Sequence, residues 1–253
     1  MAAVQADGKI LDILLPIAIA LLPAIGTIIG GLIAESTKAP KWVVGAALHA
    51  AAGIAIAVVS VDLMPRIMDE GAVLAAMLAF ATGAAFSVLL VWGVRYAQRH
   101  ADGHQTATGV WMIYAAIAAD LFGDGLMTGI GYSVSSSLGV ILGLSQLIGN
   151  IPGGFGAMAG FKSEGVPRNR RLMIIATFAV PIVCGAGIGF LGLRDATSFT
   201  QMLALAFVVG ILLLATVEDT LPQGDEPEPP RHLSTAAFSG GFIFFAVLAS
   251  SFS

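Results

Sequence analysis

The chain has 253 residues, of which 57% are hydrophobic and only 11% are charged, and its mean hydropathy is +0.90. A soluble domain usually carries about 25% charged residues, so this composition cannot cover a surface that faces water. It therefore excludes an ordinary soluble protein and predicts an integral membrane protein, with no nucleic acid among its partners.

The N-terminal segment "MAAVQADGKILD" has no positive n-region and no small-residue cleavage site, so we expect no removable signal peptide. Apolar stretches of about 20 residues mark bilayer crossings. Eight are predicted, at roughly 11–34, 42–65, 72–94, 109–133, 138–161, 172–193, 199–221 and 235–252. Their short connections favour one helical bundle, a single domain over residues 1–253. The acidic, proline-rich segment 222–234 is expected to be a mobile loop.

The positions of lysine and arginine predict the orientation, because cytoplasmic loops keep these residues. Lys9, Arg66 and Arg194 lie in the set of alternating loops that includes the N-terminus, and the other nine of the 12 basic residues lie in the opposite set. Both termini are therefore expected outside. The formal net charge of −4 does not oppose this, since acidic residues carry little topological weight.

The fourth span contains "IAADLFGDGLMTGIG" (117–131), in which Asp120 and Asp124 lie four residues apart on one helix face. Each aspartate at a helix centre costs about 2.5–3.5 kcal/mol of insertion free energy, so a purely structural helix has no reason to carry two. Thr128 extends the polar stripe by one turn. The pattern is typical of a cation site, and hydrogen bonding of protonated aspartates between helices is the alternative.

The fifth span contains "SQLIGNIPGGFG" (145–156), in which Gln146 and Asn150 are also four residues apart. Pro152 has no N–H to donate, so the carbonyl of Ile148 is freed to coordinate a ligand. Gly149, Gly153 and Gly156 are expected to let another helix approach closely. Packing against the fourth span would bring carboxylate, amide and carbonyl oxygens together, as a divalent cation requires. For the two amides, hydrogen bonding that holds helices together is the alternative.

The second and seventh spans end in "VDLMP" (61–65) and "EDTLP" (218–222), which share Asp-x-x-Pro. These spans exit on opposite sides of the membrane, so Asp62 and Asp219 fit an inverted repeat of the kind found in transporters with a central site. A solvated aspartate that caps a helix end is the alternative for each.

Three histidines are further candidates. His49 lies about 10 Å inside the second span, either on an ion path or as a structural residue. His100 and His104 form an i,i+4 pair before the fourth span, either as a weak metal trap or as ordinary loop residues.

Together these features resemble the ZIP (Zrt-, Irt-like) metal-transporter family. That family has eight spans with both termini outside, and spans one to three are related to spans six to eight by inversion. Its signature is His-Asn-x-Pro-Glu-Gly in span four and His/Gln-x-x-Pro-Glu-Gly in span five. Here the segments read "DLFGDG" (120–125) and "GNIPGG" (149–154). Asp120 and Asp124 stand where two of the ligands of span four stand, whereas Gly149 and Gly153 replace both principal ligands of span five.

The resemblance implies an all-α membrane bundle with an inverted 3+2+3 repeat that moves a divalent cation (zinc, iron, manganese or similar) toward the cytoplasm, rather than an enzyme. The first three and last three spans would rock against spans four and five. The ligands would be Asp120, Asp124, Gln146 and Asn150, with Asp62 at the outer mouth and His49, Glu218 and Asp219 at the inner exit. The ion would be the transported substrate, no prosthetic group is expected, and oxygen ligands suit harder ions than zinc.

Two alternatives stay open. A non-transporting relative that acts as a sensor or partner subunit is favoured by the lost ligands of span five. An intramembrane aspartyl protease is more remote, because Asp120 and Asp124 share one helix and the Gly-x-Gly-Asp signature is absent. The expected partners are the lipid bilayer and the cation, a homodimer is allowed, and the expected location is a bacterial inner membrane.

Overall fold

The computed structural model describes residues 2–37, 40–69, 71–100, 105–226 and 228–251. These residues are helical apart from short turns and form no strand. Eight helical segments are long and apolar enough to cross a membrane, which confirms the predicted all-α membrane bundle. They are Leu14–Ser36, Lys41–Asp69, Val73–Gly93, Ile113–Val134, Ser136–Ser163, Arg168–Leu193, Ser198–Asp225 and Arg231–Ser250.

The individual helices are α1 (Ala2–Ser36), α2 (Lys41–Ala57), η1 (Val58–Leu63), α3 (Met64–Asp69), α4 (Val73–His100), α5 (Gln105–Val134), α6 (Ser136–Ser163), α7 (Arg168–Thr177), α8 (Ala179–Leu193), α9 (Ser198–Ala215), η2 (Thr216–Thr220), α10 (Leu221–Asp225) and α11 (Arg231–Ser250). The loop predicted over 222–234 is too long, because α10 continues to Asp225 and α11 begins at Arg231. Pro222 lies in the first turn of α10, which follows η2 without a break.

Two prolines explain the π-helical segments η1 and η2. Pro65 and Pro222 have no N–H to donate and their rings crowd the preceding turn, so the hydrogen bonds before them shift from i−4 to i−5. The Met64 N–H accordingly donates to the Val59 carbonyl, and the Leu221 N–H donates to the Thr216 carbonyl. The two Asp-x-x-Pro motifs therefore mark matching distortions within spans two and seven rather than the ends of these spans.

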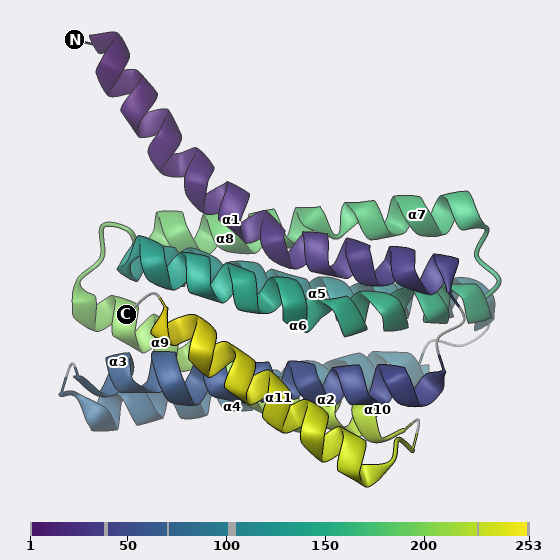
Figure 1. The fold of residues 1–253 in the computed structure, drawn as a ribbon. Helices are drawn as coiled ribbons and strands as arrows, with labels where there is room; N and C mark the ends of the chain where they lie inside the picture. The colour runs from purple at the N-terminus through teal and green to yellow at the C-terminus, as the bar shows by residue number, and fades with distance from the viewer. Residues whose placement is uncertain (1, 38–39, 70, 101–104, 227, 252–253) are drawn as a thin grey trace.

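Four helix pairs make the most extensive contacts, namely α1 with α6, α5 with α8, α2 with α11, and α4 with α9. Glycines permit this close approach. A Cβ added at Gly30 would fall on the Ile151 carbonyl of α6, and one at Gly125 would fall on the Ile182 carbonyl of α8. The helices thus form two groups, α1 with α5–α8, and α2–α4 with α9–α11 (Figure 1).

The contact pattern agrees with the predicted inverted repeat. Exchanging spans one to three with spans six to eight, and span four with span five, turns the α1–α6 pair into α8–α5 and the α2–α11 pair into α9–α4. The same exchange turns η1 of span two into η2 of span seven. Spans one and six pack with spans four and five rather than with the other outer spans, and rocking of the outer spans against spans four and five stays a prediction.

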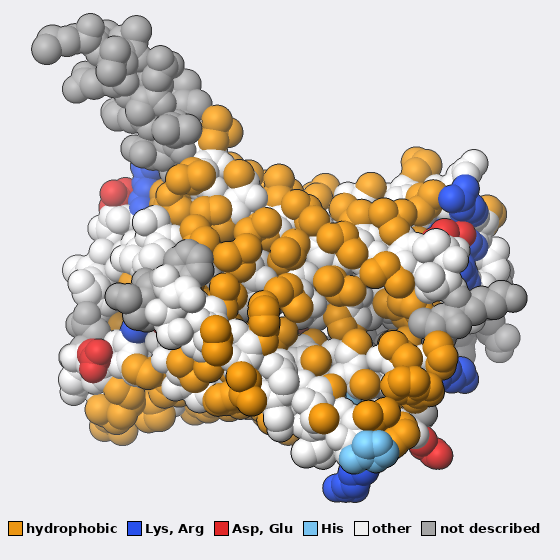
Figure 2. Space-filling view, viewed as in Figure 1, with side chains coloured by type: hydrophobic (Ala, Val, Ile, Leu, Met, Phe, Trp, Pro, Cys, Tyr) orange, Lys and Arg blue, Asp and Glu red, His pale blue; other side chains and the backbone are white. Residues whose placement is uncertain are grey.

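The distribution of side chains on the surface fits a membrane protein. Figure 2 shows hydrophobic side chains over the middle of the visible face, with charged side chains gathered at its two ends. The end where α6 finishes and α7 and α11 begin is called the basic end here; it carries Lys41, Lys162, Arg168, Arg170, Arg171 and Arg231. The start of α1 and the end of α11 lie at the opposite end (Figure 1). That this end faces outside remains a prediction.

A partly buried ion cluster joins three spans at the basic end. The carboxylate of Glu35, at the end of α1, accepts hydrogen bonds at 2.8 and 2.9 Å from Nη2 of Arg171 in α7. Arg168 Nε and Lys162 Nζ lie 3.4 and 3.7 Å from the same carboxylate, whose side chain is only 11% exposed. Lys162 Nζ also donates to the Ala34 carbonyl at 2.6 Å.

This cluster predicts a specific effect on stability. Arg171→Ala removes the two short bonds to Glu35 and is expected to lower the melting temperature in detergent by about 4 °C. Arg170→Ala, a neighbouring exposed arginine, is the matched control and should change it little. Size-exclusion profiles recorded after heating measure both variants. Equal melting temperatures for the two would show that the cluster does not hold α1 to α7.

Candidate metal site between α5 and α6

Helices α5 and α6 form an antiparallel hairpin that fixes which residues face each other. Ser135 separates them and caps α6, its hydroxyl accepting a hydrogen bond at 3.1 Å from the Leu138 N–H. In such a hairpin the helices run in opposite directions, so moving four residues forward along α5 corresponds to moving four residues backward along α6. Asp124 therefore faces Asn150, and Thr128 faces Gln146. The i,i+4 spacings seen in the two spans are one set of contacts across one interface.

Hydrogen bonds connect all four of these residues. Asn150 Nδ2 donates to Oδ2 of Asp124 at 2.6 Å. The Thr128 hydroxyl donates to Gln146 Oε1 at 2.7 Å, and Gln146 Nε2 donates to the Asp124 backbone carbonyl at 3.3 Å. Asp124, Thr128 and Gln146 are 8%, 0% and 7% exposed. The packing of spans four and five and the meeting of Asp124, Gln146 and Asn150 are as the sequence predicted.

Asp120 lies outside this set of paired residues. Its partner one step further along α6 would be Gly154, which packs instead against the Thr27 carbonyl of α1. The Asp120 side chain is exposed, and the charge of Asp219 in η2 acts on it, as its own charge acts on Asp124. Asp120 therefore lies close enough to both Asp124 and Asp219 for its charge to interact with theirs.

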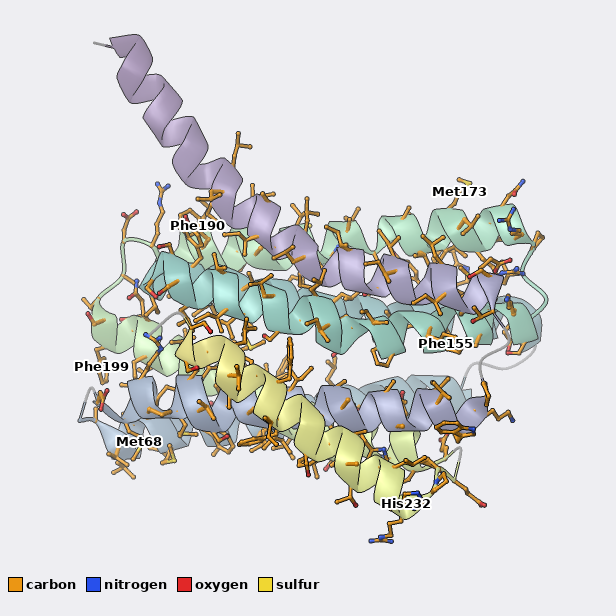
Figure 3. All side chains as sticks on the ribbon, viewed as in Figure 1. Met68, Phe155, Met173, Phe190, Phe199 and His232 are labelled. Atoms are coloured by element: carbon orange, nitrogen blue, oxygen red, sulfur yellow. The ribbon has the colours of Figure 1, made fainter. Side chains whose placement is uncertain are left out.

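The two sides of Asp124 differ in packing. Toward the opposite end, α5 and α6 contribute apolar side chains to a buried cluster shared with α2 and α9; those from α5 and α6 are Met127, Ile130, Leu138, Ile141 and Leu142. Toward the basic end Asp120 is exposed, but α5 and α6 contribute Leu121, Met158 and Phe161 to a second buried apolar cluster, which they share with α1, α7 and α8. Figure 3 shows Phe155 of α6 on the side of the bundle where His232 lies, away from Phe199 and Met68. Asp124 therefore lies between two buried apolar clusters, with the exposed Asp120 one turn closer to the basic end.

The remaining candidate residues have partners that the sequence interpretation did not assign. Asp62 is 8% exposed and its Oδ1 accepts a hydrogen bond at 2.9 Å from Arg66 Nε, while its Oδ2 is buried without a hydrogen-bond partner. Arg66 also lines a cavity of about 150 Å³ with Gln201 and Ser198. The i,i+4 spacing of Asp62 and Arg66 was a readable signal for this pair.

His49 contacts a residue in the segment that was predicted to be a loop. Its Nδ1 lies 2.8 Å from the Gly45 carbonyl, and its Nε2 lies 3.3 Å from Oδ1 of Asp225 in α10. The side chain of Glu218 is exposed and that of Asp219 is half-buried. His104 and the side chain of His100 lie outside the described residues, so their proposed metal trap stays a prediction.

The site offers oxygen ligands. No group of three or more His, Cys, Asp and Glu side chains that could hold a metal ion occurs among the described residues. What α5 and α6 bring together is the carboxylate of Asp124 and the amides of Asn150 and Gln146, with Asp120 one turn away. Carboxylate, amide and water oxygens suit hard divalent cations.

An eight-span helical bundle with a carboxylate buried between two of its helices is typical of polytopic membrane transport proteins. The model of the ZIP zinc transporter family matches residues 95–249, more than half of the chain. The protein is therefore a member of the ZIP family and a metal transporter of the membrane. No curated protein matches the sequence.

Proposed function

We propose that this protein carries a divalent cation through the α5–α6 interface toward the basic end, the cytoplasmic side of a bacterial inner membrane. The observation that carries the proposal is the buried Asp124 carboxylate and its 2.6 Å hydrogen bond from Asn150 across the two helices. A charged aspartate at membrane depth is expensive and normally serves an ion path. A positive ion beside it offsets that charge.

The residues around Asp124 have distinct proposed roles. Asp124 and Asn150 are the first ligands, and Asn150 also orients the carboxylate. Gln146 is held by Thr128 and by the Asp124 backbone, so it positions the hairpin and reaches an ion only if the Thr128 bond opens. Asp120 is the next ligand toward the basic end, where Asp219 and Glu218 continue the acidic path. His49 and Asp225 are further groups at that exit.

The exposed Asp120 on the side of the basic end supports release there. The apolar cluster of Met127, Ile130 and Leu142 separates Asp124 from the opposite end, where Asp62 is paired with Arg66. An ion arriving from that end requires this cluster to open and can compete with Arg66 for Asp62. A divalent cation that crosses roughly 100 mV gains about 4.6 kcal/mol, which is enough to drive inward movement.

The test is uptake by sealed liposomes that contain the purified protein. With an inside-negative potential, Mn²⁺, Fe²⁺, Co²⁺ and Zn²⁺ are offered separately and the internal metal is measured. Uptake of at least one ion above protein-free liposomes is the expected result. Binding of an ion without uptake would favour the non-transporting sensor or partner subunit, which the absence of a three-residue His, Cys, Asp or Glu group in the described chain also favours.

A further inference from the structure

Glycines occupy one side of α6 without an apparent packing reason. Gly149 and Gly153 are two of them, and a Cβ added at either would meet no atom within 4 Å. On the helix, Gly149 lies between Ile148, which packs on the apolar cluster shared with α2 and α9, and Asn150, which binds Asp124. These glycines therefore border the Asp124 site on the side of the second helix group.

The predicted close approach of another helix at Gly149, Gly153 and Gly156 was wrong, and neither close packing nor backbone conformation requires glycine there. Gly154, by contrast, touches the Thr27 backbone, so any side chain at 154 would clash. Of the described glycines only Gly71 and Gly165 have positive φ angles. A glycine inside a helix costs about 1 kcal/mol relative to alanine. Two glycines beside a buried carboxylate are explained if a ligand occupies the space that their missing side chains leave open.

The Asp124 carboxylate indicates what uses this space. Only its Oδ2 accepts a hydrogen bond from the described residues, the bond from Asn150. Its Oδ1 accepts none, although the side chain is 8% exposed. The amides of Asn150 and Gln146 turn their N–H groups toward Asp124, so a cation bound to Oδ1 would complete its coordination with water. Hard ions such as Mn²⁺ and Mg²⁺ take six oxygen ligands and keep several waters, whereas Zn²⁺ favours four ligands that include nitrogen or sulfur.

We propose that Gly149 and Gly153 are specificity-determining residues that leave room for water on the bound cation, so that the site selects partly hydrated, oxygen-preferring ions such as Mn²⁺ over Zn²⁺. This inference rests on the proposed function of the α5–α6 site. Gly149 and Gly153 have no side-chain ligand atoms, so they would set the ion selectivity through the volume that they leave open beside Asp124.

Filling the space without adding ligands is the first test. The double variant Gly149→Ala, Gly153→Ala adds two methyl groups that meet no other atom, so the fold should be kept and the helix slightly stabilised. Its Mn²⁺ uptake by liposomes is expected to fall by about tenfold or more. Water-proton relaxation by bound Mn²⁺, which counts coordinated waters, should fall as well. Gly187→Ala in α8, also unobstructed, is the matched control.

Adding a nitrogen ligand is the second test. Gly149→His places an imidazole beside Asp124 and should raise uptake of Zn²⁺ relative to Mn²⁺ by about tenfold. Preference of the parent protein for Zn²⁺, or a double alanine variant with parental uptake and relaxation, would overturn the inference. Failure of the parent protein to transport or bind any of these ions would instead reject the proposed function.

Discussion

Asp124→Asn is expected to reduce metal uptake by about 100-fold, toward the level of protein-free liposomes. The substitution keeps the shape of the side chain but removes the charge that faces the cation and replaces an acceptor of the Asn150 bond. It also removes the insertion penalty of a mid-membrane aspartate, about 2.5–3.5 kcal/mol, so the protein should fold as well as the parent or better. If the variant loses uptake while its stability is unchanged or higher, the charge of Asp124 serves transport rather than folding.

The control for this prediction is Asp195→Asn, which makes the same chemical change in the connection between α8 and α9. The Asp195 side chain is 87% exposed and contacts only Arg194. Metal uptake by the Asp195→Asn protein should equal uptake by the parent protein. Equal uptake by Asp124→Asn and the parent would contradict a ligand role for Asp124, and equal loss in both variants would point to a general charge effect.

Gly30→Leu is expected to destabilise the protein more than any surface change, because α1 and α6 meet backbone to backbone at this position. The Cβ would fall on the Ile151 carbonyl, and neither helix can move without separating the long α1–α6 contact. Overpacking at such a site costs about 3 kcal/mol, the upper end of the usual range. The melting temperature and the yield of monodisperse protein after detergent extraction measure the effect.

Gly240→Leu is the matched control for Gly30→Leu. Gly240 lies in α11, is exposed, and a Cβ there would meet nothing within 4 Å. This variant should extract and melt like the parent. A Gly30→Leu protein with the stability of the Gly240→Leu protein would show that the backbone contact between α1 and α6 is not needed for the fold.

The hydrophobic spans and the Asp124 pair were predictable because they depend on local spacing. Long apolar runs in a chain with little charge have few alternatives to membrane helices. The short turn at Ser135 makes α5 and α6 antiparallel neighbours, so equal i,i+4 spacings in the two spans had to meet. The contact of Asn150 with Asp124 follows from that register and from the need of a buried carboxylate for a donor.

Other features depend on helices far away in sequence and could not be predicted. Asp120 shares a helix face with Asp124, and the register of the hairpin places Gly154 opposite it. Helix α1 packs on Gly154, however, so Asp120 has no partner there in α6. Asp225 meets His49 only because η2 lets span seven continue into α10. The grouping of spans one and six with spans four and five likewise depends on glycine contacts between distant segments.

The most direct measurement is the position of a bound ion, found by anomalous X-ray scattering from crystals soaked in Mn²⁺. A peak at coordination distance from the Asp124 carboxylate, beside Asn150 and bordered by Gly149, is the expected result, and it should vanish in Asp124→Asn crystals. Ordered Mn²⁺ elsewhere in the bundle, with none at Asp124, would show that α5 and α6 do not hold the transported cation.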